Sequence, residues 1–150
     1  MNTRLQDAYI YATAGMLFFT ALVKFTSLPG TAPILDWLDP LLPLSNRMVF
    51  LLGGLLELGL SAYLFLGVDR PAKILAIGWL ALIYLIYRLG LWWAGAPGLC
   101  HCLGNLTDRY PISPVMLNRI TWILLGWLLL GSHAFVIAHR LIRRTRESSR

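Results

Sequence analysis

The chain has 150 residues, of which 57% are hydrophobic and only 13% are charged, and its formal net charge is +6. A soluble domain carries about 25% charged residues, so this composition excludes an ordinary water-soluble domain and indicates a membrane protein. The positive charge does not indicate nucleic-acid binding, because most basic residues lie at the ends of apolar segments and form no single basic surface.

Four apolar runs predict an all-α fold, a single-domain four-helix transmembrane bundle. The first run covers residues 8–25. A basic residue precedes it, as in a signal peptide, but no small-residue cleavage site follows, so we expect an uncleaved helix. The second and third runs cover about 46–68 and 71–93, and the tight turn between them makes them antiparallel neighbours. The fourth covers about 115–139 and leads into a basic, frayed tail at 140–150.

Three of the predicted helices have start signals. Pro43 and Ser45 precede the second span, and Pro71 suits the first turn of the third. Ser113 and Pro114 form an N-cap and first-turn pair before the fourth span. These signals predict where the helices begin more sharply than hydropathy does.

The segment between the first two spans, residues 26–45, is too apolar for a free loop. It contains four prolines and two aspartates but neither Lys nor Arg. We therefore expect an interfacial lid or a short helix lying at the level of the lipid headgroups, where Trp37 is favoured.

The distribution of Lys and Arg predicts the orientation of the bundle. Eight of the thirteen basic residues lie in the N-terminus, the turn between the second and third spans, or the tail: Arg4, Arg70, Lys73, Arg140, Arg143, Arg144, Arg146 and Arg150. The positive-inside rule therefore places both termini in the cytoplasm. In a bacterium this arrangement predicts an inner-membrane protein whose 26–45 segment and third connection face the oxidising periplasm.

The third connection holds the two cysteines of the chain, in the motif Cys100-His101-Cys102. Thiols this close can pair only if the backbone bends, and Gly98 and Gly104 allow such a bend. A strained, exposed disulfide of this kind is typically labile or catalytic, so the motif predicts redox chemistry. A protonated His101 would favour a thiolate beside it; as a solvated loop residue it would not.

Two other interpretations of the cysteines stay open. A static disulfide would staple the loop, although closing so short a loop removes little chain entropy. Metal binding lacks ligands, because adjacent residues cannot surround a metal and His133 lies roughly 27 Å along the fourth helix. Met48 and Met116, at outer helix ends, are candidates for a soft copper site.

Charged residues inside the spans form a second candidate site. Glu57 lies in the middle of the second span, Arg88 lies inside the outer end of the third with Tyr84 on its face, and Lys24 closes the first. A charge in hydrocarbon costs roughly 2.5 to 3.5 kcal/mol on insertion scales and is usually paired or functional. We expect Glu57 to pair with Arg88, either as a structural clamp or as part of a pocket for a quinone headgroup or a proton shuttle.

Four spans, an acidic residue in the second and the motif Cys100-His101-Cys102-Leu103-Gly104 before the fourth resemble the MauE/DoxX-like redox-associated membrane proteins. The resemblance covers most of the chain in topology. Leu103 is a departure from the family pattern, because phenylalanine is frequent at this position of the motif. It implies a role with periplasmic thioredoxin-like proteins, as in maturation of the disulfide-rich small subunit of methylamine dehydrogenase.

The sequence therefore predicts a membrane thiol–disulfide redox protein in which Cys100 and Cys102 exchange with a thioredoxin-like partner. Because the chain has no second cysteine pair, its electrons must come from or go to another protein or a membrane carrier such as quinone. The alternatives are a non-enzymatic membrane scaffold with a structural disulfide and a copper-handling protein. The residues do not decide whether the protein is an enzyme, which cysteine attacks, or its oligomeric state.

Overall fold

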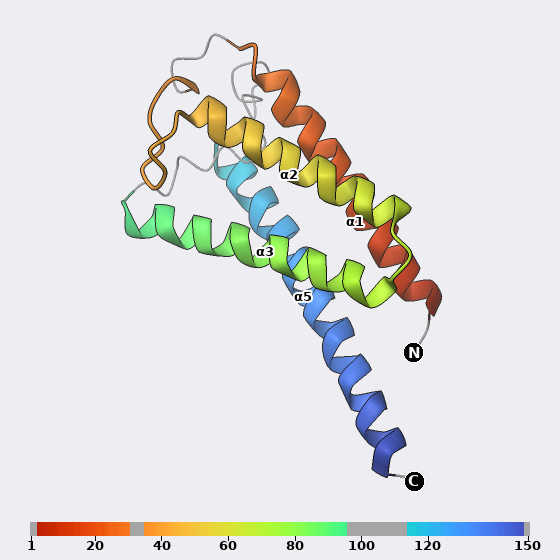
Figure 1. Ribbon diagram of the computed structural model, residues 1–150. Coiled ribbons are helices and arrows are strands. Elements are labelled where there is room, and N and C mark those ends of the chain that lie inside the picture. Colours follow the sequence, from red (N-terminus) through yellow and green to blue (C-terminus); the bar gives the residue numbers. More distant parts are fainter. Residues whose placement is uncertain (1–2, 31–34, 96–113, 149–150) are drawn as a thin grey trace.

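In the residues that it describes, the computed structural model contains four long helices (Figure 1). It describes residues 3–30, 35–95 and 114–148. The helices are α1 (Thr3–Ser27), α2 (Asn46–Leu66), α3 (Arg70–Trp93) and α5 (Pro114–Ser148). Each contains an 18-residue segment apolar enough to cross a membrane. The predicted all-α, four-helix transmembrane bundle is therefore confirmed.

Both termini lie at one end of the bundle, which we call the tail end (Figure 1). At the opposite end, the loop end, α1 and α3 finish while α2 and α5 begin. An even number of crossings requires this arrangement, and it agrees with the prediction that the two termini share a side.

The two outermost boundaries differ from the sequence-based prediction. α1 begins at Thr3 rather than at residue 8, and α5 continues to Ser148 through the predicted frayed tail. The stretch 139–148 contains neither Gly nor Pro and is rich in Arg, a strong helix former, so nothing in it ends the helix. Hydropathy detects only the apolar part of such a helix, so α1 and α5 extend beyond the predicted spans, whose limits in a membrane stay a prediction.

The start signals perform as predicted where the structure describes them. The Ser45 hydroxyl caps α2 by accepting a hydrogen bond from the backbone N–H of Met48, at 3.4 Å. Pro71 lies in the first turn of α3, and Pro114 is the first residue of α5. Ser113 lies outside the described residues.

The bundle consists of two helix pairs, because α1 packs mainly on α2 and α3 mainly on α5. Small residues permit close approach within each pair. A Cβ at Gly54 would lie 3.2 Å from the ring of Phe25, and one at Gly78 would lie 3.3 Å from the Ser132 hydroxyl. Small residues are common at helix contacts in membranes, where packing rather than water exclusion drives association.

The two pairs are joined at the tail end by contacts between α1 and α5. The Tyr9 ring lies directly against Gly131, and its hydroxyl donates a hydrogen bond to the Leu128 carbonyl at 3.1 Å. One turn further along α1, Thr13 accepts a hydrogen bond from the Trp127 indole at 3.2 Å. These contacts hold the pairs together at this end, whereas a space remains between them nearer the loop end.

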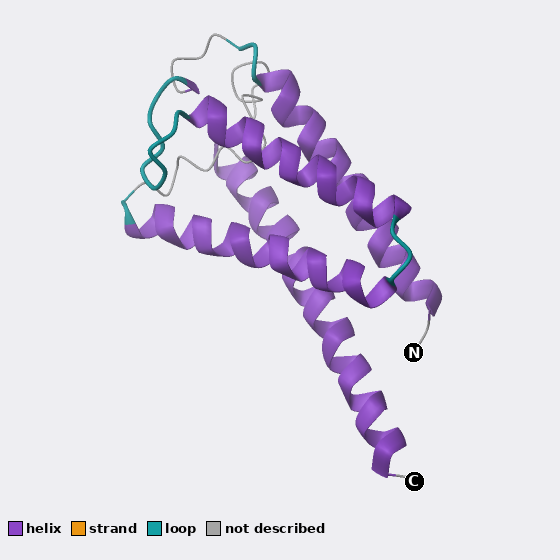
Figure 2. Cartoon of the chain, in the orientation of Figure 1, coloured by secondary structure: helices purple, strands orange, loops and turns teal. Residues whose placement is uncertain are grey.

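The segment 35–45 covers part of the loop end as an irregular turn, shown in teal in Figure 2. One carboxylate oxygen of Asp39 accepts the backbone N–H groups of Leu41 and Leu42 at 2.8 and 2.9 Å. Trp37 and Leu38 are largely exposed. Residues 36–45 form no helix, and the predicted position of the segment at the lipid headgroups stays a prediction.

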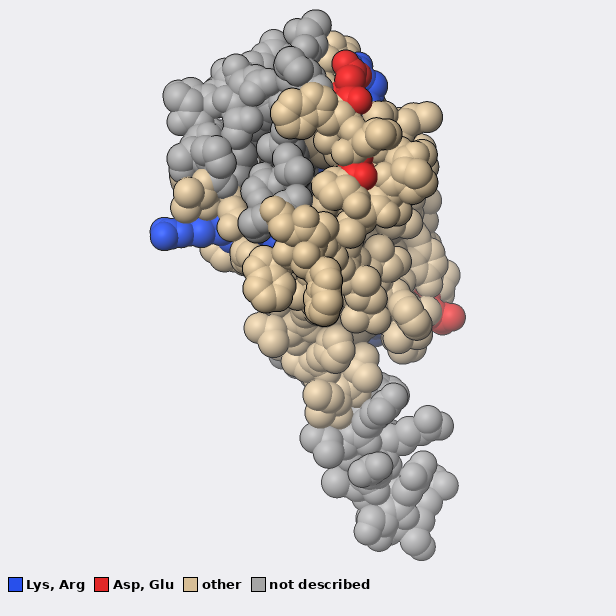
Figure 3. Space-filling view, turned by 90° about the vertical axis from the view of Figure 1, so that its left-hand side faces the viewer, with Lys and Arg blue, Asp and Glu red and all other residues tan. Residues whose placement is uncertain are grey.

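The outer surface of the bundle is predominantly apolar. Most of the described surface in Figure 3 carries neither basic nor acidic side chains. Leucine, isoleucine, phenylalanine and tryptophan side chains from all four helices are exposed on it. Such a surface would aggregate in water, so it is suited to a lipid bilayer.

The Tyr9–Gly131 contact predicts how a larger residue at position 131 would change the stability of the bundle. An ideal Cβ at position 131 would lie 2.3 Å from the Tyr9 ring, whereas nothing lies within 4 Å of one at Gly126 on the same helix. We expect Gly131→Ala to destabilise the bundle by about 1–3 kcal/mol through overpacking. Gly126→Ala, the matched control, should be neutral or slightly stabilising because alanine favours helix. Thermal unfolding in detergent, followed by circular dichroism, measures both; equal effects of the two variants would contradict the proposed contact.

Candidate functional site

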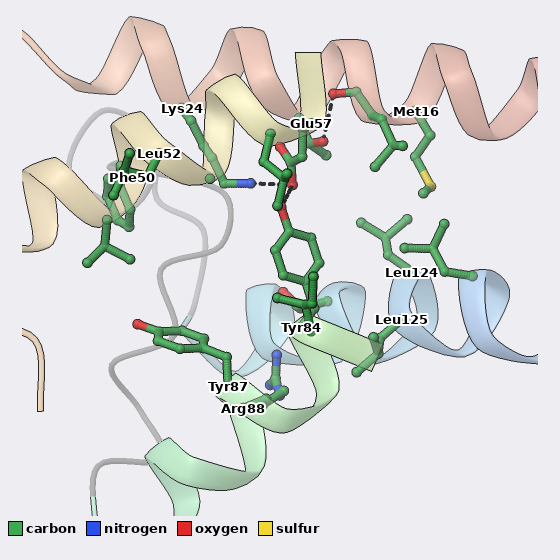
Figure 4. Close-up of a pocket in the computed structure, with 18 of the residues that line it drawn as sticks. Met16, Lys24, Phe50, Leu52, Glu57, Tyr84, Tyr87, Arg88, Leu124 and Leu125 are labelled. Carbon is green, nitrogen blue, oxygen red and sulfur yellow. Dashed lines mark hydrogen bonds and ion pairs between the residues drawn. The ribbon is translucent and has the colours of Figure 1, made fainter. Parts of the chain in front are cut away.

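A pocket with a volume of about 240 Å³ lies between the two helix pairs, and all four helices contribute to its wall. Its lining is mostly apolar and includes Met16, Phe50, Leu124 and Leu125 (Figure 4). The pocket exists because the side chains pack within each pair more closely than between them. Ligands commonly bind in cavities between the helices of a bundle, so this pocket is the candidate ligand site.

A buried ion pair crosses one side of the pocket. The Lys24 ammonium on α1 lies 2.5 Å from Glu57 Oε1 on α2, and both residues are less than a tenth exposed. The Tyr84 hydroxyl on α3 donates to the same oxygen at 2.7 Å. Figure 4 shows Lys24 and Tyr84 converging on Glu57 from different helices. This cluster therefore links the α1–α2 pair to α3.

Helix geometry explains why Lys24 and Glu57 meet. Side chains lean toward the N-terminus of their own helix, and α1 and α2 are antiparallel. Lys24 therefore leans toward the tail end and Glu57 toward the loop end. The Lys24 side chain passes over Gly53, where a Cβ would lie 3.9 Å from its Cε. The glycine beside Glu57 leaves room for the lysine chain.

The predicted Glu57–Arg88 pair is wrong, because the Glu57 carboxylate binds Lys24 and Tyr84 instead. Arg88 lies one turn beyond Tyr84, about 6 Å nearer the loop end. Its guanidinium donates to the Asn118 side chain and stacks over the Trp122 ring at 4.5 Å. Sequence spacing placed Arg88 on the correct helix face, but it did not show that α5 would occupy that side of it.

The two oxygens of the Glu57 carboxylate have different surroundings. Oε1 accepts both hydrogen bonds, whereas Oε2 is buried and has no hydrogen-bond partner among the described residues. Lys24 has three N–H donors, and the described residues accept one of them. The cluster therefore neutralises its own charge but leaves hydrogen-bonding capacity at the pocket.

A second tyrosine on α3 makes a similar contact with the 35–45 segment. The Tyr87 hydroxyl donates to the second carboxylate oxygen of Asp39, which is buried. Leu42 from the same segment reaches the pocket lining, and Leu41 packs against Gly90. This link was not predicted from the sequence. The available signals were an aspartate within an apolar segment and the i,i+3 spacing of Tyr84 and Tyr87.

The predicted redox residues Cys100, His101 and Cys102 lie outside the described residues, as does the rest of 96–113. The flanking helix ends, Trp93 and Pro114, both lie at the loop end. The two helix ends that flank the motif in the sequence therefore lie at the same end of the bundle.

The proposed copper ligands receive no support from the described part of the chain. Met48 and Met116 are both exposed, and neither lines the pocket. The ring nitrogen Nδ1 of His133 lies 2.8 Å from the Leu129 carbonyl of its own helix. Among the described residues, no group of three or more His, Cys, Asp and Glu side chains is arranged to hold a metal ion.

Comparison with known proteins found no matching family model, curated protein or solved structure. The chemistry of the site therefore follows from its own residues. They form an apolar pocket within a membrane bundle, with a buried, charge-neutral polar cluster on one wall.

The Lys24–Glu57 ion pair predicts how removal of either charge would change the stability of the bundle. Removing one partner of a buried pair leaves an uncompensated charge and costs about 3–5 kcal/mol, so Lys24→Met and Glu57→Gln should each destabilise strongly. The double variant should lose much less than the sum of the two. Tyr84→Phe, which removes one hydrogen bond, should cost about 1 kcal/mol. Unfolding free energies are measured for the unmodified protein and all four variants. The two single variants and the double variant form a double-mutant cycle, and additive losses in it would show that the two charges are not coupled.

Proposed function

We propose that the protein is a bacterial inner-membrane thiol–disulfide redox protein that links a periplasmic thioredoxin-like partner to a quinone in the bilayer. Cys100 and Cys102 would exchange thiols with the partner, and the pocket would hold the quinone headgroup. The observation that carries the proposal is the position of this pocket beside a polar cluster, nearer the loop end, from which the cysteine-bearing connection extends.

The proposed reaction balances without any further reactant. When two thiols form a disulfide they release two electrons and two protons, and a quinone that takes up both becomes a quinol. The same exchange can run in reverse, so the scheme holds for either direction of electron flow. A thioredoxin-like partner would enter through a mixed disulfide with one cysteine, which the other cysteine then resolves.

The proposed orientation rests on the distribution of basic residues. Arg70 and Lys73 lie at the start of α3, which is at the tail end with both termini. If the positive-inside rule holds, the tail end is cytoplasmic and the loop end periplasmic. The four-helix fold is compatible with the MauE/DoxX-like resemblance, which is the source of the proposed partner.

A second candidate function is a membrane scaffold that keeps a structural disulfide and assembles a partner. The exposed tryptophans at the loop end favour this alternative, because Trp92 and Trp93 are 70% and 88% exposed at the end of α3. Tryptophan is common in binding surfaces and also at the membrane–water interface. A scaffold would keep its cellular role when both cysteines are changed to serine.

The reduction potential of the Cys100–Cys102 pair tests the redox function directly. Alkylation of the detergent-solubilised protein across a glutathione series should give a potential between about −120 and −270 mV, the range of exchange proteins. Single Cys100→Ser and Cys102→Ser variants should then trap a mixed disulfide with the partner. A potential below about −300 mV would identify a structural bridge. Thiols that never pair, together with stoichiometric copper in the purified protein, would favour metal handling.

The role of the pocket has its own test. Glu57→Gln and Arg88→Gln should each lower quinone-linked thiol oxidation by about tenfold or more, since both side chains line the pocket. Arg70→Gln is the matched control, because Arg70 pairs with Asp7 on the exposed surface at the tail end. Thermal midpoints measured alongside identify any loss caused by unfolding. Full turnover in both pocket variants would eliminate the quinone part of the proposal.

A further inference from the structure

Three residues on α2 and α3 line the pocket and are also about half exposed on the outside of the bundle. Leu52 and Leu56 on α2 are 53% and 46% exposed, and Ile83 on α3 is 49% exposed; all three line the pocket. Gly54 marks the face of α2 that contacts α1. Leu52 and Leu56 share the opposite face of α2, which is turned away from α1. We call this rim of three residues the α2–α3 opening.

The α2–α3 opening lies at the depth of the hydrocarbon rather than at a membrane surface. Leu52 and Leu56 lie roughly 9 and 15 Å along α2 from its first residue, and Ile83 lies roughly 15 Å from the last residue of α3. A bilayer core is about 30 Å thick, so Leu56 and Ile83 would face acyl chains near its middle and Leu52 would face them nearer the loop end. A water-soluble molecule would not reach the pocket by this route.

The polar wall behind the opening restricts the ligand further. The Lys24 ammonium retains N–H donors for a hydrogen-bond acceptor, and Glu57 already neutralises its charge. An anionic head group beside Lys24 would also be close to the Glu57 carboxylate, and like charges repel strongly where the dielectric constant is low. The other cation of the lining, Arg88, lies one turn nearer the loop end, where its guanidinium contacts Asn118 and Trp122. A neutral carbonyl or hydroxyl group avoids the repulsion by Glu57.

We infer that the pocket takes its ligand sideways from the bilayer through the α2–α3 opening, and that this ligand is a lipid with a neutral, hydrogen-bonding ring and an apolar chain. The ring would lie against Lys24, Glu57 and Tyr84, while the chain would leave between Leu56 and Ile83. The inference deepens the proposed function, because quinones belong to this class. The binding that it describes does not require the cysteines.

The test uses the full-length protein in phosphatidylcholine nanodiscs, with a decyl-substituted benzoquinone as the probe. Bound quinone is extracted and quantified per protein, and the amount held by empty nanodiscs is subtracted. Leu56→Trp and Ile83→Trp would fill the opening with a larger side chain. Leu55→Trp and Ile86→Trp are matched controls, because these residues are 51% and 62% exposed on the same helices but do not line the pocket.

We expect the two opening variants to weaken binding of the probe by about tenfold, equivalent to about 1.4 kcal/mol, and the two controls to bind as the unmodified protein does. Equal binding by all four variants would overturn the proposed route. A benzoquinone without a chain that binds as tightly as the probe would overturn the role of the chain. A competition experiment tests the preference for a neutral head group. If palmitate displaces the probe as effectively as a second neutral decyl-substituted quinone does, that preference is wrong.

A cysteine-free variant separates this inference from the proposed function. Cys100→Ser/Cys102→Ser should bind the probe normally, and loss of binding in this variant would contradict the inference. If the probe binds but the cysteine pair has the potential of an inert bridge, the binding site stands and the redox function fails. If the pair has a working potential but the unmodified protein binds no probe, the inference and the quinone part of the proposed function both fail, while thiol–disulfide exchange by the cysteines stands.

Discussion

The buried Lys24–Glu57 pair is the interaction on which the arrangement of the site depends. Neither charge would be tolerated alone in hydrocarbon, so α1 and α2 have to be placed where the two side chains meet. Tyr84 then ties α3 to the same carboxylate. A single carboxylate oxygen therefore connects three helices at a point where a cavity separates the two pairs.

The pairing of helices explains why there is a pocket at all. Glycines allow α1 to approach α2 and α3 to approach α5 closely, while the tail end is held by Tyr9, Trp127 and their partners. Nearer the loop end, large side chains line the facing surfaces and leave a space. The Asp39–Tyr87 contact places the 35–45 segment over this half of the bundle. The polar groups of the site therefore also hold the fold together.

Prediction from sequence succeeded for properties that depend on neighbouring residues. Hydropathy located all four spans, and Ser45 and Pro71 marked the starts of α2 and α3. It failed at the two ends of the chain, where polar residues continue the helices in α1 and α5. Within the site, the sequence identified Lys24, Glu57, Tyr84 and Arg88 as buried candidates because charged or hydroxyl-bearing residues are unusual in apolar spans. The partners of Glu57 were assigned incorrectly.

The sequence by itself determined that this is a four-helix membrane protein with buried charges in three spans and a cysteine motif in one connection. These features follow from composition and from the 3.6-residue period of a helix. Only the tertiary structure decided that Glu57 binds Lys24 and Tyr84 while Arg88 turns to Asn118 and Trp122. The physical reason is that a helical pattern specifies the face on which a residue lies, whereas its partner depends on which helix packs against that face and at what depth. For the same reason, the Asp39–Tyr87 contact and the α2–α3 opening could not be predicted from the sequence.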